Sequence, residues 1–260
     1  TITTTDAAAT DIDMVNSTST PEFNIAGGAT SITLSNLRDG SSIRTSEAAT
    51  SGDIDVGYRN ATSDASLVVD LATQHDGDGD TMTFTNVANV TLNAVNGIDG
   101  DGAAEGADML LVLDDTTLLE GVASDAVRSL TINNNGVATN GTDDILLSDV
   151  SNSSLLETLT LNATGSAVTL GTVAEAEALT SLTINSDGGE VNVGAIGGTN
   201  ASTALDAITV TATEDVTLGV VEANNTAGVS TVTLAAADGD IEGLALTNDA
   251  GSIDAVTLSG

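Results

Sequence analysis

The sequence predicts an all-β protein, a parallel β-helix solenoid in which each coil uses about 24 residues. Three observations support this fold class. Two columns of short segments recur along the chain with nearly the same period, apolar residues alternate with Thr or other polar residues inside each segment, and no stretch shows the apolar spacing of a helix. The chirality of parallel crossover connections favours a right-handed coil.

The first column contains five segments of one pattern, which reads apolar, two small or polar residues, apolar, Thr, apolar. Their starting residues are Leu156, Leu179, Leu205, Val229 and Ile253, so the period is nearly constant. Parallel stacking at ~4.8 Å per coil should therefore place the second apolar residue of each segment in one internal column. Its members are Leu159, Leu182, Ile208, Val232 and Val256.

A second column lies between the segments of the first and keeps a similar period. Its segments begin at Val168, Val191, Val216 and a degenerate Ile241, and the first three end in Gly. A third strand per coil is expected near Val173, Ile196, Val221 and Leu246. Leucine-rich repeats also show Leu-x-x-Leu-x-Leu at this period and are the second choice of fold. The Gly-ended strand column favours the β-helix.

We expect one continuous domain. Residues 1–20 are interpreted as an N-terminal arm or lead-in, and residues 21–260 as a single β-helix with loop insertions near 74–81 and 96–108. The last repeat ends at Ser259-Gly260 without a polar capping segment, and an uncapped coil presents an open strand edge. This favours a parent chain that continues, or an end that meets another molecule, and in both cases an assembling protein.

The charge balance restricts the partners. The chain carries four Arg, no Lys and 38 acidic residues, for a formal net charge of −34. That sign excludes nucleic acid and anionic membrane surfaces as partners, and no apolar run is long enough for membrane insertion. Aromatic residues make up 1% of the chain, which argues against a stacking platform for bases or sugars. Bound divalent cations or high salt are expected to offset the self-repulsion.

Acidic loops provide the candidate metal sites. Asp76, Asp78 and Asp80 alternate with Gly, so three carboxylates can converge on a hard cation such as Ca²⁺. Asp99 and Asp101, in a Gly-rich loop, form a second candidate. The competing interpretation in each case is a solvated acidic turn whose carboxylates bond nearby backbone groups.

Catalysis finds little support in the sequence. His75 is the only His and lies in an acidic turn, and the four Arg are isolated along the chain. We therefore expect no enzyme, although paired-carboxylate chemistry on glycans remains an alternative. The Thr of the first column suits an outward strand position. An ice-binding Thr face would need a second unbroken Thr column, and the partner column contains Ala207 and Ala255.

The composition contains no Cys and no Lys and is rich in Thr, Ala, Gly and Asp, and segments such as Val87–Leu92 and Leu156–Leu161 recur. In these features the chain resembles bacterial surface-layer proteins and related extracellular matrix proteins exported by type I systems. The resemblance implies β-rolls or β-helices that assemble outside the cell when Ca²⁺ binds. The tandem Gly-Gly-x-Gly-x-Asp nonapeptides of that group are missing here. Only the alternating Asp76, Asp78 and Asp80 resemble their ligand loops.

The sequence thus predicts a secreted structural protein at the cell surface, with acidic loops stabilised by Ca²⁺. Its main expected partner is itself, in a surface layer, filament or matrix, and a cell-surface polysaccharide is a second one. The alternatives are the stalk of a large adhesin, a glycan-active β-helix enzyme and an ice-binding solenoid.

Overall fold

The computed structural model describes residues 1–4, 10–19, 21–26, 31–46, 53–60, 65–71, 81–94, 112–114, 121–124, 127–134, 145–150, 155–173, 177–197, 204–223, 229–248 and 252–260. These residues form strands and turns. They contain no helix, and hence none long and apolar enough to cross a membrane.

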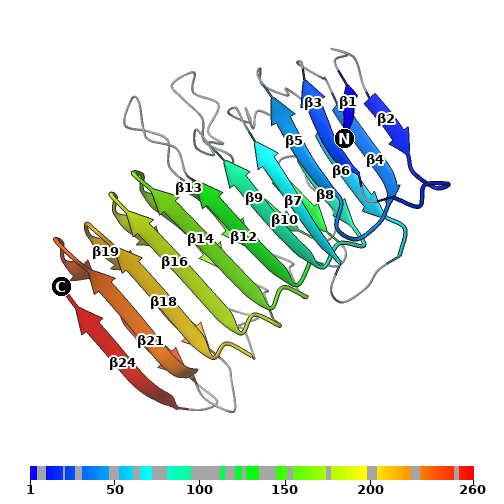
Figure 1. Ribbon diagram of the computed structural model, residues 1–260. Coiled ribbons are helices and arrows are strands. Elements are labelled where there is room, and N and C mark those ends of the chain that lie inside the picture. The colour runs from blue at the N-terminus through cyan, green and yellow to red at the C-terminus, as the bar shows by residue number, and fades with distance from the viewer. Residues whose placement is uncertain are drawn as a thin grey trace.

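Two long sheets and one short sheet make up the fold (Figure 1). Sheet A consists of β1 (Ile2–Thr4), β3 (Glu22–Ala26), β5 (Ser42–Ser46), β7 (Ser66–Leu71), β9 (Asn89–Ala94), β12 (Ser129–Asn134), β14 (Thr158–Thr164), β16 (Ser181–Asp187), β18 (Ala207–Ala212), β21 (Val229–Ala236) and β24 (Ile253–Ser259). Sheet B consists of β2 (Thr10–Asp13), β4 (Ser31–Leu37), β6 (Asp53–Tyr58), β8 (Thr81–Thr85), β11 (Gly121–Ser124), β10 (Val112–Asp114), β13 (Ile145–Val150), β15 (Val168–Val173), β17 (Val191–Val193), β19 (Val216–Leu218) and β22 (Ile241–Glu242). The short sheet pairs β20 (Val220–Ala223) with β23 (Ala245–Asn248).

Apart from β10 and β11, which both belong to sheet B, and the short-sheet strands β20 and β23, the chain alternates between the two long sheets. Every described strand pair is parallel, so the predicted parallel β-helix is confirmed. Figure 1 shows the strands of sheet A lying side by side from the N-terminal to the C-terminal end of the solenoid. The sheets share one apolar core, because alternate residues of each strand point inward, as the burial pattern of β14 and β16 shows.

The register agrees with the repeat columns of the sequence. Leu159 pairs with Leu182, Leu182 with Ile208, Ile208 with Val232, and Val232 with Val256. The first four of these side chains are at most 1% exposed. A one-residue slip would turn every one of them outward, so burial fixes the register.

The third strand column is also confirmed. Val173 pairs with Ile196 and Ile196 with Val221 as isolated bridges, and Val221 pairs with Leu246 between β20 and β23. The Gly at the end of the second column has a steric explanation. A Cβ on Gly194 would lie 2.7 Å from the carbonyl oxygen of Gly171 in the preceding coil. Consecutive coils therefore approach each other more closely here than a side chain permits.

The first twenty residues differ from the expected arm or lead-in. β1 pairs with β3, and β2 pairs with β4, so the described part of this segment adds one strand to each long sheet. Ile2, Ile12 and Met14 pack against the core, which explains why so polar a segment joins the sheets.

The long connection between β9 and β12 contains the short strands β10 (Val112–Asp114) and β11 (Gly121–Ser124). Sheet B runs β8, β11, β10, β13, so these two strands stand in reverse chain order. The loop insertions predicted near 74–81 and 96–108 lie outside the described residues except for Thr81, the first residue of β8. Because the described repeats consist of strands without a helix, the leucine-rich repeat is excluded as the fold.

Candidate functional site

The predicted Ca²⁺ ligands Asp76, Asp78, Asp80, Asp99 and Asp101 lie outside the described residues, as does His75. Within the described ranges, no three acidic or His side chains gather in a way that could hold a metal ion.

Several carboxylates that the structure does describe bond backbone amides at turns. Asp39 accepts the N–H of Ser66 at 2.8 Å, and Asp215 accepts the N–H of Asp240 at 2.8 Å. Both bonds join adjacent coils. Part of the acidic content therefore serves as hydrogen-bond acceptors between coils.

The outward face of sheet A between β9 and β24 contains three neighbouring columns without a charged side chain. The charged residues within these strands, Asp187 at the end of β16 and Asp254 near the start of β24, lie outside these columns. Each of these seven strands contributes one outward residue to each column, which makes 21 positions in three columns. A random draw at the chain's charged fraction of 16% would place about three charges among them. We call this surface the neutral face. Its members are Asn89, Thr91, Asn93, Ser129, Thr131, Asn133, Thr158, Thr160, Asn162, Ser181, Thr183, Asn185, Ala207, Thr209, Thr211, Thr231, Thr233, Ala235, Ala255, Thr257 and Ser259.

The central column of the neutral face holds Thr in all seven strands, from Thr91 to Thr257. The column beside it contains Asn, Ser, Thr and Ala. Ala207 and Ala255 therefore interrupt this column in the structure, as the sequence analysis expected. β-branched Thr suits such an outward strand position. The three columns of the neutral face are therefore regular and polar without being charged.

The third column contains a ladder of amide hydrogen bonds that the sequence analysis missed. The Nδ2 of Asn185 donates to the Oδ1 of Asn162, that of Asn162 to Asn133, and that of Asn133 to Asn93, each at 2.8 Å. The Nδ2 of Asn93 donates to the Oδ1 of Asp70 at 2.7 Å. A carboxylate only accepts, so Asp70 sets the direction of the ladder. The sequence feature that could have revealed this ladder is an Asn two residues after the Thr of the central column, as in Thr160 and Asn162.

Charged residues border the neutral face where the strands begin. Arg128 and Glu157 form an ion pair of 2.5 Å there, and the Asp206 carboxylate bonds the Ser230 hydroxyl in the same border column. Both members of the ion pair are more than 40% exposed, so the pair contributes little to stability. Charged residues thus begin directly beside the neutral face.

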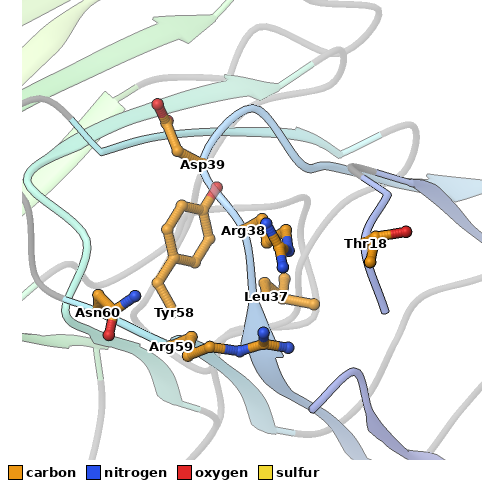
Figure 2. Close-up of a pocket in the computed structure, with 7 residues that line it drawn as sticks. All are labelled: Thr18, Leu37, Arg38, Asp39, Tyr58, Arg59 and Asn60. Carbon is orange, nitrogen blue, oxygen red and sulfur yellow. The ribbon is translucent and has the colours of Figure 1, made fainter. Parts of the chain in front are cut away.

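A cavity of about 380 Å³ lies near the N-terminal end, at the turns that follow β4 and β6 (Figure 2). Leu37 pairs with Tyr58, and the N–H of Arg59 donates to the Leu37 carbonyl at 2.9 Å. Arg38 and Arg59 are therefore the residues directly after a paired Leu37 and Tyr58, and they lie on adjacent coils. The sequence analysis treated these two Arg as isolated, although their separation along the chain is close to the length of one coil.

Backbone carbonyls hold both guanidinium groups. The Nε of Arg38 donates to the carbonyl of Ser17 at 3.1 Å, and the Nη2 of Arg59 donates to the carbonyls of Met14 and Val15 at 2.7 and 2.5 Å. The Nε of Arg59 is buried and has no hydrogen-bond partner.

Tyr58 forms the wall between the cavity and the core. Its hydroxyl donates to the carbonyl of Ser66 at 2.6 Å. Burial, and secondarily the nearby Asp39 carboxylate, raises the pKa of Tyr58 well above its usual value. The phenol therefore stays neutral and keeps donating this bond across the physiological pH range.

Fold and surface together define a parallel β-solenoid with three neighbouring uncharged columns on one long sheet and a turn cavity lined by two Arg. Comparison with protein-family models, with curated proteins and with solved structures finds no match to this chain, so its function is inferred from the geometry alone.

Proposed function

We propose that the protein is an extracellular structural component that assembles with copies of itself into a surface layer, filament or matrix, and that copies meet through the neutral face. The observation that supports this most directly is the absence of charge in three neighbouring outward columns over seven consecutive described strands of sheet A, in a chain of net charge −34. Such a face lets two acidic copies approach without bringing carboxylates together.

The size of the neutral face suits a stable contact. Seven strands at ~4.8 Å and six residues at ~3.3 Å give about 34 Å by about 20 Å, or roughly 700 Å² per copy. Two copies would bury about 1,400 Å² in total, which falls within the range of specific protein interfaces. The Thr column and the Asn ladder fix side chains at the same spacing on both copies, so two faces can interdigitate in register.

Electrostatics favours this face over the rest of the surface. Carboxylates on two copies repel within the Debye length, about 8 Å at physiological ionic strength. Contact through the neutral face keeps most acidic residues at its rim or on other faces. Salt or Ca²⁺ at the acidic loops would further reduce the repulsion between copies.

Sedimentation velocity of the purified chain over a range of concentrations tests the proposal. Thr160 lies in β14 with neutral neighbours Thr131 and Thr183, so Thr160→Glu places a charge within the contact. Thr169→Glu in β15 is the matched control, because Thr169 also points outward from a strand, but on sheet B.

We expect the wild-type chain and the Thr169→Glu variant to associate, and association to strengthen with added NaCl as repulsion is screened. The Thr160→Glu variant should weaken association about tenfold or more, since two copies would each bury an unpaired charge. A wild-type chain that stays monomeric at every concentration and salt, or equal association of both variants, would refute the proposal.

A further inference from the structure

Arg38 and Arg59 form an unusual pair for this chain. They are two of its four cationic side chains, and they follow paired positions on adjacent coils. Like charges on neighbouring strands repel each other. Neither is in an ion pair with a carboxylate of the described residues, although the chain has 38 acidic residues.

The two guanidinium groups line the cavity together and retain free hydrogen-bonding capacity. An Arg side chain has five N–H donors. Arg38 uses one of them for the Ser17 carbonyl, and Arg59 uses its Nη2 for Met14 and Val15 while its Nε has no partner. Figure 2 shows both side chains on the side of the Tyr58 ring that faces Thr18. The bonds to backbone carbonyls hold both groups in place before any ligand arrives.

The remaining lining residues indicate which anion fits. Thr18, Asn60 and Asp39 border the same cavity. With two Arg and one Asp, the lining carries one net positive charge, which suits a monoanion better than sulfate or phosphate. Thr18, Asn60 and Asp39 offer the donors and acceptors that sugar hydroxyls require. A volume of about 380 Å³ is sufficient for one sugar ring.

We propose that this cavity binds a single uronic acid residue of a cell-surface glycan, with the sugar carboxylate between Arg38 and Arg59. A planar carboxylate matches the fork geometry of guanidinium and relieves the repulsion between the two Arg. The ring hydroxyls bond Thr18, Asn60 and Asp39. This site is separate from the neutral face, so it links the protein to a surface glycan independently of contacts between copies.

Isothermal titration of the full chain with a glucuronate disaccharide tests the site, with the matching glucose disaccharide and inorganic sulfate as comparison ligands. The test variant is Arg38→Gln, and the control is Arg44→Gln, which removes the same charge from an exposed position on the neighbouring strand β5. Arg59→Lys keeps the positive charge but removes the planar guanidinium group, which can donate two parallel hydrogen bonds to a carboxylate. Far-UV circular dichroism checks that each variant is folded.

We expect glucuronate to bind the wild-type chain at least tenfold more tightly than the neutral disaccharide or sulfate. Loss of a charge-assisted hydrogen bond should weaken glucuronate binding by about tenfold or more in the Arg38→Gln variant. The Arg59→Lys variant should also bind more weakly, and the Arg44→Gln variant should bind within about twofold of wild type. Absence of glucuronate binding, equal affinity for sulfate, or equal losses in the Arg38→Gln and Arg44→Gln variants would overturn the assignment.

Discussion

Asn162 provides the sharpest test of the inter-coil ladder. Its amide donates to Asn133 and accepts from Asn185, so Asn162→Ala removes two hydrogen bonds. Asn185→Ala is the matched control, because Asn185 takes part in a single bond of the ladder, to Asn162. The intrinsic strand preferences of Asn and Ala enter both substitutions equally and cancel in the comparison.

The expected magnitude follows from the net value of a hydrogen bond, about 0.5–1.5 kcal/mol. Two partly exposed bonds give a loss of about 1–2 kcal/mol for Asn162→Ala, and one bond gives about half as much for Asn185→Ala. Urea denaturation followed by far-UV circular dichroism measures both losses, since the chain has no Trp and a single Tyr. A loss for Asn162→Ala no larger than that for Asn185→Ala would show that the ladder does not stabilise the stack.

The direction of the ladder gives a further check with Asn162→Asp. Between Asp70 and a carboxylate at position 162, Asn93 and Asn133 supply two amide donors for three inter-coil contacts. One contact must then bring two oxygens together. Protonation of the new carboxyl below about pH 4 restores a donor. The stability deficit of this variant relative to wild type should therefore shrink in acid, and a deficit that is independent of pH would contradict the ladder.

Three other predictions follow from the same structure. Gly194→Ala should lower the free energy of unfolding by about 1–3 kcal/mol, because the new Cβ would overpack against the Gly171 carbonyl. Gly57→Ala is the control, since its Cβ would lie 3.9 Å from the nearest atom, and it should lower the free energy of unfolding much less in the same denaturation assay. Tyr58 has a folded-state pKa above its ordinary value of 10.0, so its contribution to stability is fully present below about pH 10 and is lost as pH rises further; tyrosinate absorbance that titrates identically in native and urea-unfolded chain would contradict this. Chelation by EDTA should lower the melting temperature and dissolve assemblies, and a chain unaffected in both respects would remove Ca²⁺ from the proposal.

Inward columns could be predicted from the sequence because burial imposes a strict alternation. The positions of Leu159, Leu182 and Ile208 follow from period and polarity alone, and the structure confirms their register. The weaker third column at Val173 and Ile196 was found for the same reason. Residues 1–20 were harder to interpret, because β1 and β2 are short and each has few apolar residues to reveal the alternation.

Outward features were mostly missed, because many polar residues are compatible with a solvent-facing position. The Asn ladder depends on neighbours one coil away, as between Asn162 and Asn185, and single segments do not show it. Arg38 and Arg59 likewise become a pair only once Leu37 is known to lie beside Tyr58. The acidic loops with the predicted Ca²⁺ ligands lie outside the described residues, so that site stays a prediction.

A spin label on the neutral face tests most directly which surface joins two copies. The chain has no Cys, so Thr183→Cys places one label at the centre of the face, and Thr169→Cys places one on sheet B. Electron paramagnetic resonance of the assembled protein should show dipolar coupling between the Thr183→Cys labels of neighbouring copies and markedly weaker coupling for Thr169→Cys. Strong coupling at position 169 with none at position 183 would show that the copies meet through a different surface.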